Sequence, residues 1–484
     1  MRFTCNRILP SVRSLAFAST PLLLATALVL GIASSAAANN GGGGGNGGGD
    51  DDGGAVFGNP IAGVDVDATG VLKIRTVDPR LAQQRLREAR LRAQTDDVMQ
   101  RSELRKVSLN RLEKVIADHV AGDRPLSDDV LAVAGLTTIQ YVFYYPDTQD
   151  IVIAGPAEGF VADPTQRFVG MNTGRPSVLL EDLVTALRAY PPAAEPTRII
   201  SVSIDPTPEG LARMQQFLRA VGGRANRGDT MRLVQGLKQN LGLQTVTIQG
   251  IPADTHFARV LVEADYRMKL IGIGLEQLPV PVRSYVSRTS PQSVAANALE
   301  RWYFQPNYDG VSVSDDRLAM RINERGVQLV GEGERVLGGG KRVQAGRGNR
   351  ASQAFTQEFT EKYSLIASKV RIYAELQQLI DIAIAAAYIQ EQDFYTQAGW
   401  SMEVLGDEKQ VPVQTYTAPE KVETAVNAIW RGNTLMTPLG GGVNMQPRVA
   451  FNRDRMVVDQ SGENVAVKQS AGPSDLEPGQ WWWD

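Results

Sequence analysis

One stretch of the chain, residues 243–281, constrains the fold more than any other. It opens with β-branched residues and stops at residues 251–252, Ile-Pro, which is typical of a strand followed by a turn. Residues 257–268 then carry apolar side chains at helical spacing, and Asp254 or Thr255 can cap that helix. A second apolar run with two glycines follows. The stretch therefore predicts strand, turn, helix and second strand within a mixed-sheet α/β or α+β core.

The predicted helix also carries the best candidate for chemistry. His256, Arg259 and Glu263 follow one another at spacings of three and four, so their side chains would form one polar row. Such a row could orient a substrate carboxylate. It could equally be an exposed ladder of ion pairs, in which arginines flank Glu263 and basic residues follow Asp265. The candidate binding residues of this region are Asp254, His256, Arg259, Glu263, Asp265 and Arg267.

Other chemistries lack support in the sequence. The chain contains no H-E-x-x-H motif, nucleophile elbow, dinucleotide fingerprint or S-x-x-K motif. His119, the other of the chain's two histidines, has no histidine or cysteine companion, so neither a metal site nor a cofactor is predicted. The formal charge of −3 gives a nucleic-acid partner no electrostatic support.

Residues 1–38 carry the clearest targeting signal. A positive n-region with three arginines precedes a mostly apolar run at 15–32, and Ala36, Ala37 and Ala38 supply the small residues of a cleavage site. This pattern predicts a signal peptide and export to the periplasm or beyond, with a retained membrane anchor as the alternative. Cleavage would change the formal charge from −3 to −6 and remove Cys5, leaving no cysteine for a disulfide, nucleophile or metal site.

Composition divides the rest of the chain. Residues 39–58, rich in glycine and aspartate, predict a disordered linker. Residues 59–135 predict a mainly helical region after a short strand. Its apolar stripe is thin, so these helices should lie on the surface of another domain or pair with a partner helix. Residues 136–335 alternate strands, helices and hairpin turns, and so predict the mixed core. Residues 336–353 form a basic, glycine-rich loop, but Gly-Lys is followed there by arginine, so the loop lacks a Walker phosphate signature.

The longest helical signal lies in residues 354–455, together with a small α/β segment. Apolar residues from 355 to 389 recur at intervals of three and four, which predicts a helix of roughly 50 Å. Residues 380–389 are apolar almost all round, interrupted by Asp381. This run is too short to cross a bilayer, so we expect it to be buried and the mature chain to have no transmembrane span. A pore or anchor is the alternative.

Residues 456–484 predict a disordered tail with a tryptophan-rich end. Trp481, Trp482 and Trp483 stand together at that end. If exposed, such side chains would suit docking onto an apolar or membrane-interface surface. They are therefore candidate binding residues.

Three motifs carry a family resemblance. They are IPADTHFARVLVEADYRMKLIGIGLE at 251–276, RIISVSIDPTPEG at 198–210 and YAELQQLIDIAIAAAYI at 373–389. Together they resemble an exported, uncharacterised planctomycete family known only as a domain of unknown function, over residues 141–451. The resemblance implies export and a shared core. It implies no activity, so it assigns no catalytic residue.

Two functional hypotheses follow. The first is an exported, non-enzymatic binding or scaffolding protein of the cell envelope, with an envelope protein as partner and homo-oligomerisation through its long helices as a further option. The second is an envelope hydrolase with Glu263 or Asp265 as base and His256 as its partner, since glycosidases show that two carboxylates can suffice. Hydrolysis would require these groups to converge in a concave pocket. Without a catalytic signature, the first hypothesis is favoured and the three side chains are predicted to be structural.

Overall fold

The structure is a computed structural model. It describes residues 61–76, 97–163, 167–221, 227–289, 298–307, 311–322, 326–336, 342–347, 349–427, 442–452 and 455–484, with short pieces at 28–30, 84, 87–88, 91, 429–431 and 434–437. The predicted signal peptide and Gly/Asp linker lie outside these residues, except for β1 (Leu28–Leu30).

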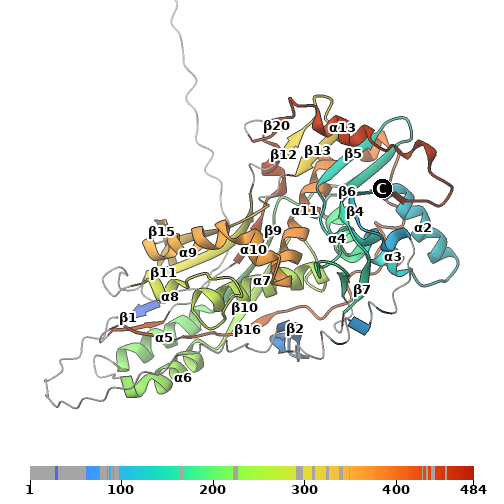
Figure 1. The fold of residues 1–484 in the computed structure, drawn as a ribbon. Coiled ribbons are helices and arrows are strands. Elements are labelled where there is room, and N and C mark those ends of the chain that lie inside the picture. The colour runs from blue at the N-terminus through green and yellow to red at the C-terminus, as the bar shows by residue number, and fades with distance from the viewer. Residues whose placement is uncertain are drawn as a thin grey trace, which may run out of the picture.

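The larger sheet has nine strands in the described chain (Figure 1). In spatial order these are β15 (Arg342–Arg347), β14 (Val327–Val336), β11 (Ala298–Pro306), β19 (Gly442–Met445), β9 (Ile200–Pro206), β10 (Leu243–Gln249), β16 (Lys421–Glu423), β3 (Val71–Thr76) and β2 (Ile61–Val66). The β11–β19 and β16–β3 pairs are parallel, and the other neighbouring strands of this sheet pair antiparallel.

A second sheet has seven strands. Their order is β20 (Val457–Val458), β12 (Val311–Val313), β13 (Ala319–Ile322), β5 (Tyr141–Tyr145), β6 (Asp150–Ala157), β4 (Ser102–Ser108) and β21 (Trp482–Trp483). The β5–β6 hairpin is where its turn residues, 146–149, predict it. Two small sheets join β7 (Phe160–Ala162) to β8 (Phe168–Gly170), and β1 to β18 (Thr434–Thr437) and β17 (Ile429–Arg431).

Two helices form the centre of the molecule. Helix α7 (His256–Gly272) packs against β9, β19 and β11 of the larger sheet. Helix α11 (Arg371–Glu391) contacts α7, α4 (Leu180–Ala189) and β5, and so lies between the two sheets (Figure 1). The prediction that residues 380–389 are buried is confirmed. Of the described helices, α11 is long and apolar enough to span a membrane, but 89% of its most apolar window is buried inside the protein.

The remaining helices surround this centre. Helices α5 (Pro208–Val221) and α6 (Thr230–Leu241) pack on each other, and α9 (Arg350–Glu361) packs on β14. The others are α2 (Leu109–Ala121), α3 (Asp128–Leu131), α8 (Tyr285–Arg288), α10 (Tyr363–Ala367), α12 (Phe394–Gln397) and α13 (Glu463–Gln469), with 3-10 turns at η1 (Asp97–Met99), η2 (Val133–Gly135), η4 (Arg227–Asp229), η7 (Pro447–Phe451) and η8 (Pro473–Asp475).

Mixed sheets with hairpins make this an α+β fold, as predicted. The prediction of one helix over 355–389 is wrong, because three helices, α9, α10 and α11, share that span. Val370 takes an extended backbone, with φ −125° and ψ 104°, and α11 restarts at Arg371. All three helices bury their apolar faces in one core, so the spacing of apolar residues continues across the breaks. The strand predicted after α7 is also absent, since the helix runs on to Gly272.

Two flanking segments differ from their predictions. The described part of residues 59–135 holds more strand than predicted, because β2 and β3 form a hairpin and β4 pairs with β6 before α2 begins. Most of residues 77–96, where a helix is predicted, lie outside the described residues. In the predicted loop at 336–353, residues 342–347 form β15, which pairs with β14, and α9 begins at Arg350. Residues 337–341 lie outside the description. The partner of β4 lies in a later segment of the chain, which residue spacing does not reveal.

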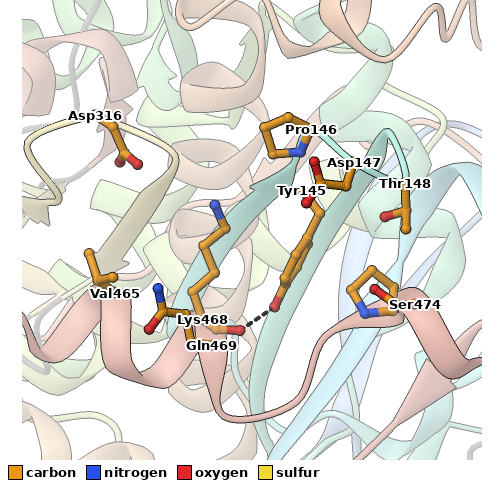
Figure 2. Close-up of a pocket in the computed structure, with 10 residues that line it drawn as sticks. Tyr145, Pro146, Asp147, Thr148, Asp316, Val465, Lys468, Gln469 and Ser474 are labelled. Atoms are coloured by element: carbon orange, nitrogen blue, oxygen red, sulfur yellow. Dashed lines mark hydrogen bonds between the residues drawn. The ribbon is translucent and has the colours of Figure 1, made fainter.

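The tail at 456–484 is ordered, contrary to the prediction. Trp481 and Trp483 are 4% and 6% exposed, and β21 pairs antiparallel with β4. Helix α13 also covers β13, and with the turn after β5 it closes a cavity of about 240 Å³. There Tyr145 donates a hydrogen bond of 2.7 Å to the backbone oxygen of Lys468 (Figure 2). Two of the three tryptophans therefore serve the chain's own core rather than an exposed docking surface.

Candidate functional site

The first turn of α7 begins with a side-chain cap. Thr255 Oγ1 accepts a hydrogen bond of 3.2 Å from the N–H of Ala258, which satisfies one of the donors left free at a helix start. Asp254 does not serve as the cap. Its backbone oxygen instead accepts a bond of 2.9 Å from the N–H of Tyr416, which ties the segment before β16 to this turn.

His256 follows the cap and forms a buried pair with Asp182 of α4. Its Nδ1 lies 2.9 Å and 3.1 Å from the two carboxylate oxygens, and its side chain is 2% exposed. Burial lowers the pKa of His256, but attraction and hydrogen bonding from Asp182 outweigh burial, so the pKa is raised above its ordinary value. The ring's Nε2 is buried without a hydrogen bond.

Arg259 lies one turn further along α7 and points to a different neighbour. Its guanidinium lies 5.0 Å from the ring centre of Tyr416, a cation–π distance, and its Nη2 donates a bond of 2.6 Å to the backbone oxygen of Val64. The hydroxyl of Tyr416 in turn donates to Glu181 Oε1 at 3.0 Å. Burial raises the pKa of Glu181, so this carboxyl is biased toward its neutral form.

These side chains form the polar end of a cavity of about 660 Å³. Arg167, which precedes β8, lines it beside Glu181, Arg259 and Tyr416. Its apolar wall includes Leu126, Leu131, Leu179, Leu180, Val411 and Val413. The cavity therefore combines a largely apolar lining with a few convergent polar groups, the composition of a small-molecule site.

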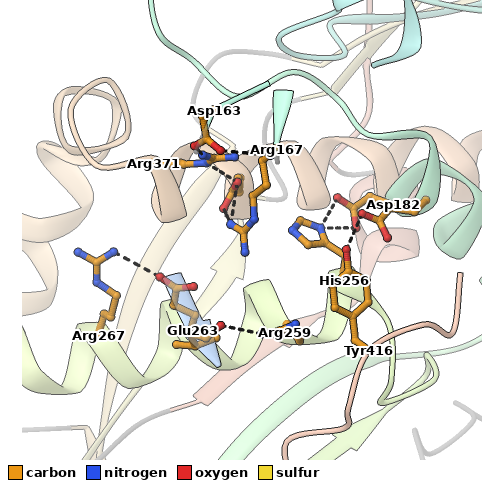
Figure 3. Close-up of polar contacts among 12 residues, drawn as sticks. Asp163, Arg167, Asp182, His256, Arg259, Glu263, Arg267, Arg371 and Tyr416 are labelled. Atoms are coloured by element: carbon orange, nitrogen blue, oxygen red, sulfur yellow. Dashed lines mark hydrogen bonds and ion pairs between the residues drawn. The ribbon is translucent and has the colours of Figure 1, made fainter. Parts of the chain in front are cut away.

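Arg167 is held in place by a chain of ion pairs (Figure 3). Its Nη1 donates to both oxygens of Glu375 on α11, at 3.0 Å and 3.1 Å. Glu375 also accepts from Arg371 at 2.7 Å, and Arg371 pairs with Asp163. Glu375 is buried, yet the two arginines outweigh the cost of burial and bring its pKa to about 2, so it remains charged. The cavity's polar end is thus fixed to the central helix.

The other members of the polar row do not reach this cavity. Glu263 is 2% exposed and lies 3.5 Å from Arg267, which also binds Glu276 at 2.7 Å. Burial raises the pKa of Glu263. The interpretation as an exposed ladder of ion pairs is therefore wrong, because Glu263 and Arg267 are buried in the protein and not solvated. Of the two arginines that flank Glu263 in the sequence, Arg267 pairs with it, whereas Arg259 donates to Val64.

Asp265 occupies yet another environment. Its side chain is fully buried, and Lys269 Nζ lies 3.0 Å from its Oδ2 and 3.2 Å from the backbone oxygen of Ile204 on β9. Burial raises the pKa of Asp265 to about 6, and burial also lowers the pKa of Lys269. This pair fixes α7 to the larger sheet. His256, Glu263 and Asp265 thus have three separate sets of neighbours.

Three residues of the cavity's polar end were missed from the sequence. Arg167, Glu181 and Tyr416 lie outside the 243–281 stretch and belong to no motif. Tyr416 meets Glu181 across 235 positions, and Arg167 meets Glu375 across 208. Within the described residues no cluster of three or more His, Cys, Asp or Glu side chains could hold a metal ion. No cofactor-binding motif marks the cavity either.

Comparison with known proteins adds one finding. Residues 202–285, from β9 to α8, match the model of a family described as "Protein of unknown function (DUF1598)". No curated protein and no solved structure matches the chain. The matched region contains the whole of α7, and hence His256 and Arg259, so the resemblance to a domain of unknown function is confirmed over these residues. The planctomycete origin and the extent over residues 141–451 stay predictions.

Proposed function

We propose that this chain is an exported binding protein of the cell envelope, which holds a small molecule in the 660 Å³ cavity without transforming it. The cavity itself carries the proposal. Its volume falls in the range of about 300–1,000 Å³ that is common for small-molecule sites. It has a largely apolar wall, with charged groups gathered at one end.

Binding fits the geometry better than hydrolysis does. The hydrolase alternative needs Glu263 or Asp265 to act with His256 on one substrate. None of the three lines the cavity, and each is almost fully buried. Arg267, Lys269 and Asp182 respectively compensate Glu263, Asp265 and His256. These features favour a structural role for the three side chains.

Export is supported by the residues at the start of the chain. A basic n-region, an apolar run and three alanines make up residues 1–38, as in secretory signals. Export could be tested by cell fractionation and N-terminal sequencing of the native protein. Retention of Met1 in a cytoplasmic fraction would contradict it.

The binding proposal is tested by filling the cavity. Leu131→Trp would place a large side chain in its apolar wall, while Leu365→Trp, on the exposed side of α10, is the matched control. We expect a panel of anionic, neutral and cationic amphiphiles to contain compounds that bind wild type with a saturable rise in melting temperature. Leu131→Trp should abolish that rise and Leu365→Trp should keep it.

Two results would contradict the proposal. One is that no compound in the panel binds. The other is that the bound compound is recovered chemically altered after incubation with wild type, which would instead support an enzyme. Mass spectrometry of the recovered compound distinguishes a binding protein from a hydrolase.

A further inference from the structure

We propose that the cavity takes an amphipathic carboxylate, whose anionic head lies between Arg167 and Arg259 and whose hydrocarbon part lies along the apolar wall. This inference rests on the proposed function, because it assigns a ligand class to the same cavity. Its basis is the bonding capacity that the polar end leaves unused.

Both arginines retain free donors. Arg259 uses Nη2 on Val64, but its Nε is buried without a hydrogen bond, which is costly unless a partner arrives. Arg167 uses Nη1 on Glu375, and no hydrogen bond from its Nε or Nη2 is formed to the described residues. Guanidinium groups recognise carboxylates through paired N–H donors, so the unused atoms suit such a head group.

The charge balance favours an anion here. Arg259 lies within ion-pair distance of no carboxylate among the described residues, whereas Arg167 is neutralised by Glu375. Arg167 and Arg259 line the same cavity. Burial first, and then repulsion from Arg167, lowers the pKa of Arg259, while Tyr416, Asp65 and Glu263 act in the opposite direction. An anion between them would relieve that repulsion.

The same balance favours a single negative charge. Glu375 and Glu263 both lie near enough to Arg167 to influence its pKa, so a dianion would meet nearby carboxylates. Arg75 also lines the cavity, but it is exposed, where solvent and salt screen its charge. Glu181 lines the same cavity, and burial raises its pKa, which lessens its repulsion of a bound anion.

The wall selects the remainder of the ligand. Leu126, Leu131, Leu179 and Val413 present hydrocarbon and no charge. Burying the ligand's apolar surface against them would contribute about 25 cal/mol per Å². A small inorganic anion would leave this wall empty. An amphiphile uses both ends of the cavity.

The test compares head groups on one chain length. Decanoate, decanol, decyl phosphate and decyltrimethylammonium are titrated into the full chain by calorimetry, with Arg259→Met, Arg259→Lys and the exposed-site control Arg232→Met beside wild type. We expect decanoate to bind at least roughly tenfold more tightly than decanol, and the ammonium compound not to bind. Arg259→Met should remove this preference, and Arg232→Met should keep it.

The outcomes separate the two proposals. If decanol matches decanoate in wild type and Leu131→Trp abolishes both, the cavity binds ligands but the carboxylate inference fails. Tighter binding of decyl phosphate would also overturn it, in favour of a phosphate ester. If none of the four binds, the carboxylate inference fails. The wild-type comparison needs no variant, so misfolding of Arg259→Met would not prevent a decision.

Discussion

The two halves of α7 carry similar charges at similar spacing and use them differently. In the first half, Arg259 reaches the cavity and keeps a buried donor without a hydrogen bond. In the second half, Asp265 and Lys269 face each other at 3.0 Å inside the core. A row of charges therefore does not mark a binding site by itself. The difference lies in access, because Arg259 lines the cavity whereas Asp265 and Lys269 are enclosed by the core.

The second half of α7, whose charges are enclosed by the core, should lose more stability on single substitutions than the first half does. Lys269→Met would leave Asp265 buried without the cation that pairs with it, at a cost of about 3–5 kcal/mol in the free energy of unfolding. The double variant Asp265→Leu/Lys269→Met removes both charges and should recover most of that loss. Urea denaturation would measure both, with the exposed-site variant Lys238→Met as control. A single variant as stable as this control would show that the pair contributes little.

The element that the sequence predicts best is this same helix. Its cap at Thr255 and its apolar spacing depend on residues within one or two turns, and the hairpin of β5 and β6 depends on a four-residue turn. The cavity could not be predicted in this way. Its polar groups come from the residue before β8, from α4 and α7, and from the segment before β16, and no local pattern relates Arg167 or Tyr416 to Arg259.

The same limit explains the errors at the tail. Arg105 is fully buried and binds the side chain of Asp484 at 2.8 Å across 379 positions, with Trp482 stacked 4.4 Å from its guanidinium. A polar, glycine-containing segment is typical of disorder when nothing covers it. Here the edge of β4 pairs with it, and that partner lies in a distant part of the sequence. Burial, like the cavity, is a property of the assembled chain.

The His256–Asp182 pair lies at the start of the first half of α7 and should show an intermediate effect. Asp182→Asn keeps the shape but removes the charge, so the pKa of His256 should fall and stability should drop by about 1–3 kcal/mol. The loss is smaller than for Lys269 because an imidazole can give up its proton. Unfolding by urea, followed across pH, measures it.

The pH dependence of this pair has a definite sign. The folded pKa of His256 is raised, so its contribution to stability is fully present below the unfolded value of about 6.5 and is lost as pH rises through the folded value. The cost of Asp182→Asn should therefore be largest below about pH 6.5 and should shrink at higher pH. The exposed-site variant Asp118→Asn should show no such trend. A pH-independent cost would mean that the histidine is neutral in the fold.

Asp381 sharpens the comparison, because it is a buried acid that forms no ion pair with a cation in the part of the chain that the structure describes. It lies on apolar α11 with 3% exposure, and burial alone raises its pKa well above 3.8. With the folded pKa raised, stability is lost as pH rises from the unfolded value through the folded one. Asp381→Asn should then stabilise the protein at neutral pH by on the order of 1 kcal/mol. Below about pH 3.8 the gain should vanish, since the carboxyl is protonated in both states.

Melting curves at neutral pH and below pH 3.8, with exposed Asp315→Asn as control, measure this gain. If Asp381→Asn instead destabilises the protein at neutral pH, the charge of Asp381 contributes to stability. A buried polar group that lacks a countercharge would then not by itself indicate a ligand-binding site in this fold.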